Sequence, residues 1–173
     1  GEFGSDSISP AMYRQYALPN LQRFFAGINM AGFPGAVHQC GETSAVLPEM
    51  VASGARIIEL DPQTDMHVAK DAARAKLSIL GMVDPANVMH RGKPDLVEQR
   101  SREALEVLAP GGGFILGPGC ALMSEVPEDN VTALIESAKR YGCYNADGSL
   151  VLPMMTRTGG RATEPTSARG SGV

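Results

Sequence analysis

Three side chains with metal-binding chemistry stand at two places in the sequence. His38 and Cys40 are two residues apart, and Cys120 follows a Gly-Pro-Gly segment at 117–119. Side chains at positions i and i+2 of a strand project from the same face, so an imidazole and a thiol at this spacing can reach one ion. An imidazole with two thiolates suits Zn²⁺, and three protein ligands with an open fourth position are typical of catalytic zinc sites.

The same three residues have a second interpretation. A His-x-Cys pair occurs by chance, and buried free cysteines behave mostly as small apolar side chains. The choice between a zinc site and simple packing depends on where the surrounding elements place these residues.

Short apolar strands alternate with helices along the chain. Glycine and proline separate β-branched, apolar segments from segments with helical spacing. The pattern predicts strands over residues 35–40, 55–61, 76–83 and 114–117. It predicts helices over residues 10–30, 43–53, 65–74, 94–108 and 131–141. Pro19 should kink or split the first of these helices.

Four strand–helix repeats predict an α/β fold built from parallel βαβ units. An open doubly wound sheet and a TIM-type (β/α) barrel both have this pattern. A barrel takes eight strands and about 250 residues, so a 173-residue chain would supply about four βα units, a half-barrel. In both architectures functional groups gather at the C-terminal ends of strands, where His38, Cys40 and Cys120 fall. Closure of a barrel would bring the last strand near the first.

The composition, 43% hydrophobic and 20% charged with a net charge of −4, is typical of a globular protein. No cluster of Lys and Arg indicates a nucleic acid partner, and no apolar run approaches the roughly 20 residues that span a bilayer. Three cysteines, an odd number without close spacing, argue against a disulfide framework. We therefore expect a cytoplasmic protein with neither a nucleic acid nor a membrane partner.

Both ends of the chain differ from the body. Residues 1–5 are predicted to be a cloning scar. Residues 156–173 consist mainly of Gly, Ser, Thr, Arg and Pro, and are predicted to form a disordered tail because they cannot bury enough apolar surface to offset the entropy of ordering. The fold is predicted over residues 6–155.

Four segments carry a resemblance to a known superfamily. They are Val-His-Gln-Cys-Gly-Glu-Thr at 37–43, Ile-Ile-Glu-Leu-Asp at 57–61, Gly-Met-Val-Asp-Pro at 81–85 and the stretch from Pro110 to Cys120. Together they resemble the C-terminal half of the uroporphyrinogen decarboxylase superfamily, and within it the zinc-dependent corrinoid methyltransferases of the methylcobamide:coenzyme M type. The resemblance extends over about residues 8–145.

This resemblance implies a (β/α)8 barrel that binds Zn²⁺ through His38, Cys40 and Cys120. It also implies an acidic fourth ligand at the end of the next strand, for which Asp61 is expected and Glu59 is an alternative on the same face. The zinc would bind a small thiol, lower its pKa and present a thiolate to the methyl group of a methyl-corrinoid. A separate corrinoid carrier protein would supply that methyl donor.

Two positions differ from the family pattern. Met82 and Glu42 stand where members commonly have Asn, so the substrate is expected to differ. Glu42 is predicted to contact substrate, as is Asp84 at a strand end, although Asp before Pro85 also commonly forms a turn. Cys143, His67 and His90 are predicted to be structural or solvated.

A half-barrel leaves two open sheet edges, and open edges invite pairing with another chain. We therefore expect a homodimer that completes the barrel, or domain exchange between chains. Two further hypotheses stay open. One is a metal-free lyase of the decarboxylase type, with His38 and Cys40 in the substrate pocket. The other is a noncatalytic half-barrel that folds by dimerisation.

Overall fold

The computed structural model describes residues 7–151 except residue 75. The predicted scar at 1–5 and the predicted tail at 156–173 lie outside the described residues. Within the described part of the chain, no helix combines the length and apolar character needed to cross a membrane.

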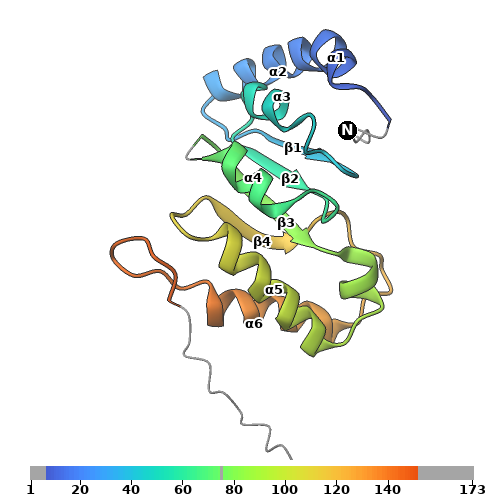
Figure 1. Cartoon of the computed structure of the whole chain (residues 1–173), viewed down its shortest axis with the longest axis vertical. Helices are drawn as coiled ribbons and strands as arrows, with labels where there is room; N and C mark the ends of the chain where they lie inside the picture. Colours follow the sequence, from blue (N-terminus) through green and yellow to red (C-terminus); the bar gives the residue numbers. More distant parts are fainter. Residues whose placement is uncertain (1–6, 75, 152–173) are drawn as a thin grey trace, which may run out of the picture.

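One parallel sheet organises the described chain (Figure 1). Its strands are β1 (Ala36–Gln39), β2 (Ile57–Leu60), β3 (Ser78–Val83) and β4 (Phe114–Pro118), in the spatial order β1-β2-β3-β4. Each strand pairs with the next one in sequence, which is the strand order of a barrel wall. In a doubly wound sheet the strand order reverses at a switch point, so that some consecutive strands are not neighbours. The predicted α/β fold with four βα units is confirmed, and the strand order favours the barrel.

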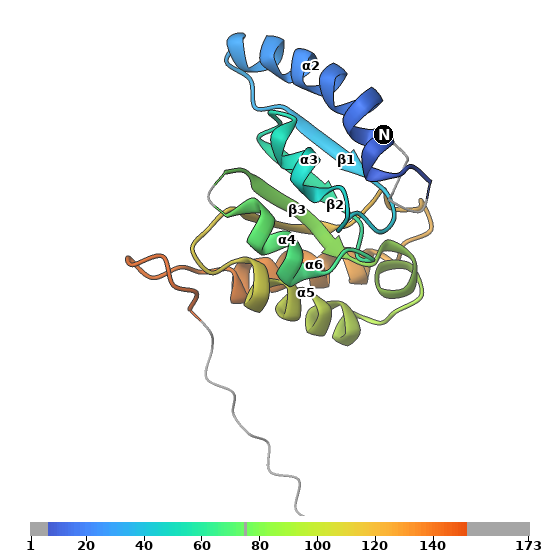
Figure 2. The same ribbon diagram turned by 45° about the horizontal axis from the view of Figure 1, so that its top comes forward.

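The helices are α1 (Pro10–Met12), α2 (Leu18–Met30), α3 (Leu47–Ala52), α4 (Met66–Ala73), α5 (Pro94–Leu108) and α6 (Glu128–Tyr141). Helices α3, α4 and α5 cover one face of the sheet (Figures 1 and 2), and consecutive helices contact each other from α2 to α6. Ile58 and Ile79 of the sheet belong to one buried cluster with Leu47 and Leu108 from these helices. The main core therefore lies between the sheet and this helix layer.

Two rows of paired residues define the faces of the sheet. Residues directly opposite each other on neighbouring strands share a face. The covered row lies against the helices and consists of Val37, Ile58, Ile79 and Phe114. The open row lies on the opposite face and consists of His38, Glu59, Leu80 and Ile115. Ile115 is 45% exposed, whereas Ile58 is completely buried.

Two π-helical segments depart from the predicted pattern. The segment η1 (Tyr13–Ala17) separates α1 from α2 just before Pro19, where a kink or split was expected. Proline lacks an amide hydrogen, so the regular helical ladder loses a bond at this point. The segment η2 (Pro85–His90) follows β3, where only a turn was expected, and includes His90.

Helices α3 and α6 begin at positions other than those predicted. Helix α3 starts at Leu47, not near residue 43, because the buried Thr43 side chain bonds with Thr64 in the loop after β2. Helix α6 starts at Glu128, before the predicted residue 131. Glu128 and Asp129 lie in its first turn, where acidic groups interact favourably with the helix dipole.

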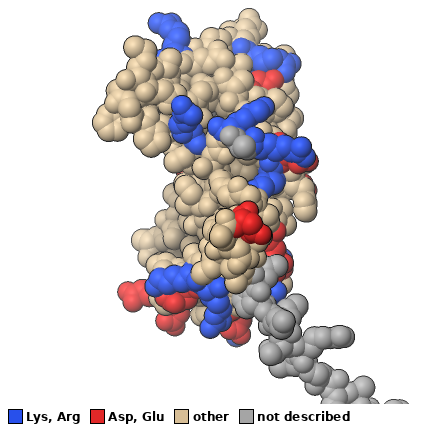
Figure 3. Space-filling view, turned by 90° about the vertical axis from the view of Figure 1, so that its left-hand side faces the viewer, with Lys and Arg blue, Asp and Glu red and all other residues tan. Residues whose placement is uncertain are grey.

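Figure 3 shows the end of the sheet where the strands begin. Basic and acidic side chains both appear on this face, with areas of other residues between them. Arg56 and Lys76 line an open hollow here, together with the exposed Phe33. This face therefore carries no continuous band of one charge.

Candidate metal centre

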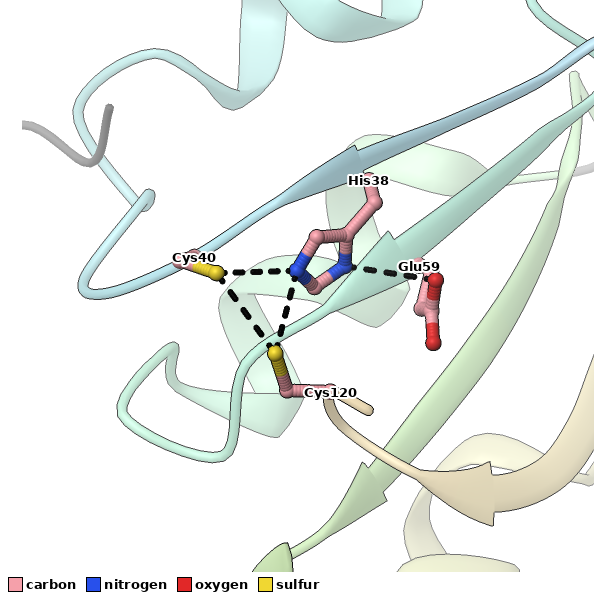
Figure 4. A network of polar contacts seen from close by, with 4 residues as sticks. All are labelled: His38, Cys40, Glu59 and Cys120. Carbon is pink, nitrogen blue, oxygen red and sulfur yellow. Dashed lines mark hydrogen bonds and ion pairs between the residues drawn. The ribbon is translucent and has the colours of Figure 1, made fainter. Parts of the chain in front are cut away.

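Three side chains converge beyond the C-terminal ends of β1 and β4 (Figure 4). Nε2 of His38 lies 2.9 Å from Sγ of Cys40 and 3.4 Å from Sγ of Cys120. The two sulfur atoms are 3.6 Å apart. All three residues are partly buried, and their ligand atoms lie within 4.8 Å of one another. The structure thus brings together the three residues that the sequence singled out.

The spacing of these atoms fits a zinc ion. Tetrahedral ligands at zinc bond lengths of about 2.0–2.3 Å stand about 3.5–3.8 Å from each other. The two distances to Cys120 are close to this range, and the His38–Cys40 pair would have to open by about 0.6 Å to reach it. A disulfide would need sulfurs about 2.0 Å apart, and neither cysteine forms one. The donor set and its spacing therefore suit Zn²⁺.

The segment after β4 carries Cys120 back across the sheet. Strands β2 and β3 separate β1 from β4, a span of about 14 Å at about 4.8 Å per strand spacing. The expected route to convergence was barrel closure, but the described chain uses a crossing loop instead. The amide of Gly119 donates a 2.9 Å hydrogen bond to the carbonyl of Val83. Cys120 thereby reaches His38 without a closed barrel.

Gly119 makes this crossing possible. A Cβ atom at this position would lie 2.7 Å from the carbonyl oxygen of Leu60 and 2.6 Å from Cδ of Pro62. Both distances are too short for real contacts, so only glycine fits without a shift. The sequence indicated that the small residues before Cys120 permit close backbone approach, and the structure shows which backbone they approach.

Two buried threonines hold the loop that carries Cys40. The hydroxyls of Thr43 and Thr64 are 2.8 Å apart, and the amide of Thr43 donates a 3.2 Å bond to Thr64 Oγ1. Thr64 also donates a 3.4 Å bond to the carbonyl of Gly41. This pair ties the loop after β1 to the loop after β2. Sequence reasoning missed it because nothing local relates residues 21 positions apart.

The two acidic candidates for a fourth ligand lie in different places. Asp61 follows β2, and its Oδ1 accepts a 3.0 Å hydrogen bond from the amide of Gln63. It is not part of the converging group, so its role as a ligand stays a prediction. Oε2 of Glu59 lies 3.3 Å from Nδ1 of His38, on the side of the ring away from the sulfurs (Figure 4). This position does not fit the alternative of Glu59 as a ligand.

Comparison with known proteins identifies the family. Residues 2–141 match the uroporphyrinogen decarboxylase (URO-D) family. The chain belongs to the URO-D family. The methylcobamide:CoM methyltransferase MtbA of Methanosarcina acetivorans is 30% identical over 134 residues, covering 78% of this chain and 38% of that protein. A uroporphyrinogen decarboxylase of Syntrophotalea carbinolica is 28% identical over 133 residues, 77% of this chain and 38% of the relative.

A solved structure supports the same assignment. A methyltransferase from Methanosarcina mazei matches with a TM-score of 0.70 and 25% identity, over 79% of this chain and 39% of that one. The resemblance inferred from the sequence and the half-barrel fold are confirmed. This URO-D chain spans about 38% of the length of the relatives it matches.

The predicted substrate-binding residues of this URO-D chain both bond to nearby backbone. Oε1 of Glu42 accepts a 2.7 Å hydrogen bond from the amide of Ser44. Oδ1 of Asp84 accepts 2.8 Å bonds from the amides of Ala86 and Asn87, so it caps η2. The structure therefore shows the turn role of Asp84, and substrate contact by either residue stays a prediction.

The hydrogen bonds to Asp84 shift its pKa. Partial burial raises the pKa of this carboxyl, but the amide and side chain of Asn87, the amide of Ala86 and the charge of Arg91 lower it by more. The net pKa lies below the ordinary value. The charged form of Asp84 is therefore the form that the fold stabilises.

Met82 adopts an unusual backbone conformation beside the site. Its φ of 80° lies in the left-handed region, where among the described residues it is the one that is not glycine, and Met82 is only 5% exposed. Asn and Asp adopt such angles more readily than methionine. Left-handed backbone costs a residue like methionine about 1–2 kcal/mol. The backbone of Met82 therefore strains the end of β3.

The remaining candidates lie apart from the cluster. Cys143 is exposed, and its thiol donates to the carbonyl of Lys139 at 3.3 Å. His67 lies on α4. His90, expected to be solvated, is half-buried at the end of η2, and its Nδ1 is inaccessible to solvent.

Proposed function

We propose that this chain carries the zinc centre of a corrinoid-dependent methyltransferase, which transfers a methyl group from a methyl-corrinoid to a zinc-activated thiol. The observation that carries the proposal is the convergence of His38 Nε2 with the sulfurs of Cys40 and Cys120. Relatives named methylcobamide:CoM methyltransferase support the class of methyl donor and acceptor. A corrinoid carrier protein would bring the donor, and a small thiol would be the acceptor.

The residues of the site have distinct roles in this proposal. Zinc bound here would lower the pKa of the incoming thiol and hold it as a thiolate. His38 would bind through a neutral Nε2, and the thiolates of Cys40 and Cys120 would balance the charge of the dication. Asp61, directly after β2, is the proposed fourth ligand.

Three residues around the site are proposed to set the substrate. Glu42 and Asp84, each in a loop that follows a strand, would contact the thiol or the corrinoid. Met82 stands where Asn is expected from the family pattern, and its side chain has no amide group. A polar group of the substrate that Asn would bind therefore has no hydrogen-bond partner in the side chain of residue 82. We therefore propose a substrate different from that of the named relatives.

Metal analysis tests the proposal directly. Purified wild-type protein should hold about one zinc per chain, and the Cys40→Ser and Cys120→Ser variants should each lose it, because three protein ligands are needed. Cys143→Ser is the matched control and should keep full zinc content. Wild-type protein that neither carries nor takes up zinc would overturn the proposal and favour the metal-free lyase.

A transfer assay separates an enzyme from a noncatalytic fragment. Methylcobalamin and a small thiol are incubated with zinc-loaded protein, and the absorbance change of the cobalamin measures demethylation. We expect turnover that disappears in Cys40→Ser. Bound zinc without turnover would favour the noncatalytic half-barrel.

We also propose that two copies associate through the open edges of the sheet. Among the described strands, β1 and β4 each pair with one neighbour only. Unpaired edges expose amide and carbonyl groups that another strand can bond. Sedimentation should show a homodimer. A monomer with well-protected amides in β1 and β4 would contradict this.

A further inference from the structure

The two nitrogens of the His38 ring face different partners. Nε2 lies 2.9 Å and 3.4 Å from the sulfurs of Cys40 and Cys120. Nδ1 points the other way, and Oε2 of Glu59 lies 3.3 Å from it (Figure 4). The ring thus stands between the two thiols and one carboxylate.

The sheet fixes the contact between His38 and Glu59. The two residues are direct register partners on the parallel strands β1 and β2. Their side chains therefore share the open face, one strand spacing of about 4.8 Å apart. Backbone hydrogen bonds set this pairing, so it does not depend on a flexible loop.

Nδ1 of His38 requires a partner, and Glu59 offers one at close range. The atom is inaccessible to solvent, and it forms no hydrogen bond within the described part of the chain. Leaving a buried donor unsatisfied costs about 1–3 kcal/mol. The carboxylate at 3.3 Å needs only a small movement to accept the Nδ1 hydrogen.

We propose that Glu59 is the positioning residue of the metal centre: its carboxylate accepts the Nδ1 hydrogen of His38 and so leaves Nε2 bare and aimed at the sulfurs of Cys40 and Cys120. This inference rests on the proposed zinc site. Neutral imidazole carries one hydrogen, on one of its two nitrogens. Only the tautomer with hydrogen on Nδ1 leaves the lone pair of Nε2 available to bind a metal. Glu59 selects that tautomer before any ion binds.

Glu59 acts through His38 and does not bind the ion itself. Its carboxylate lies beside Nδ1, across the ring from the sulfurs, and outside the group of ligand atoms within 4.8 Å of one another. Acceptors behind a ligating histidine orient the ring and raise its basicity, and removing them typically weakens metal affinity about 10–100-fold.

The tautomer of His38 tests the proposal without metal. Long-range ¹H–¹⁵N spectra of metal-free protein, recorded at about pH 8.5 where histidine is ordinarily neutral, distinguish the two nitrogens. His38 is assigned by comparison with a His38→Asn variant. We expect hydrogen on Nδ1 in wild type and a shift toward hydrogen on Nε2 in Glu59→Ala. Hydrogen on Nε2 in wild type, or no change in Glu59→Ala, would overturn the proposal.

Zinc affinity gives the second readout. Competition with a chromophoric chelator should show a dissociation constant about 10–100-fold higher for Glu59→Ala than for wild type. Glu59→Gln keeps an acceptor oxygen and should recover part of the loss, which a merely structural role would not predict. Glu136→Ala on the exposed surface of α6 is the matched control and should bind zinc like wild type.

The two readouts separate this proposal from the proposed function. If wild type binds zinc and Glu59→Ala binds it equally well, the positioning role is wrong and the zinc centre stands. If wild type binds no zinc but Glu59 still selects the Nδ1 tautomer, the zinc centre is wrong and the positioning of His38 stands. If Glu59→Ala fails to fold, the tautomer of His38 in wild type and the zinc dissociation constant of Glu59→Gln still test the positioning role of Glu59.

Discussion

The two faces of the sheet are built from different interactions. The covered row is apolar throughout and packs against helices, whereas the open row begins with His38 and Glu59. Apolar burial is non-directional and tolerates small shifts, but hydrogen bonds and metal ligation require defined distances. The covered face therefore contributes most of the stability. The open face and its C-terminal edge hold the groups for chemistry, and these groups require defined distances from one another.

The largest expected effect lies on the covered face. Ile58→Ala removes a completely buried side chain and should lower the free energy of unfolding by about 2–5 kcal/mol. Urea unfolding followed by circular dichroism, at one protein concentration, measures it. Ile115→Ala in the open row is the matched control and should cost less than about 1 kcal/mol, since that side chain is 45% exposed. Equal losses of unfolding free energy in the two variants would contradict the prediction that the covered face contributes more stability than the open face.

Gly119→Ala should disturb the metal centre and lower the free energy of unfolding by less than Ile58→Ala does. The new methyl group would meet Leu60 and Pro62, so the Cys120 segment must move. Overpacking costs about 1–3 kcal/mol, and displaced ligands should weaken zinc binding at least about tenfold. Chelator competition and urea unfolding measure the two effects. Gly27→Ala is the control, because its Cβ would meet nothing within 4 Å. Unchanged zinc affinity in Gly119→Ala would show that the crossing loop tolerates movement.

The threonine pair at the same edge should behave as one unit. Thr64→Val keeps the shape of the side chain but leaves Thr43 Oγ1 and its amide without this partner, at a cost of about 1–3 kcal/mol. The double variant Thr43→Val/Thr64→Val should cost less than the sum of the two single variants, because residues in contact are coupled. A double-mutant cycle by urea unfolding measures this. Strict additivity would show that the two hydroxyls act independently.

The smallest expected effect depends on pH. Because the folded pKa of Asp84 lies below its unfolded value, its charge adds stability above an unfolded pKa of about 3.9, and this contribution is lost as the pH falls through the folded pKa. Loss of a cap costs about 0.5–2 kcal/mol, so Asp84→Ala should be destabilised by that amount at pH 7 and by less near pH 3. Unfolding midpoints at both values check it, with Asp84→Asn as the control that keeps an acceptor without a titrating charge. A gap that stays constant with pH would contradict the prediction.

Local patterns predicted most of the fold. The helix over 94–108 was predicted at its observed bounds, since apolar spacing and flanking prolines and glycines define it locally. The bounds of all four strands differ from the predicted bounds by two residues or fewer. Three features were missed: the π-helical segment after β3, the late start of α3 and the early start of α6. The first two depend on particular side-chain bonds, those of Asp84 and of Thr43 with Thr64, that residue patterns do not reveal.

The sequence by itself determined the α/β fold, through hydrophobic periodicity and turn residues, and the chemistry of the donor set, through side-chain type. The family followed from the resemblance of four segments to a known superfamily. Only the tertiary structure decided how Cys120 reaches His38, that threonines hold the Cys40 loop, and that Glu59 faces Nδ1 and not the sulfurs. These relations join residues distant in the chain, and strand register and backbone crossings set them. A sequence states which groups are present, whereas chemistry depends on distances of a few ångströms between them.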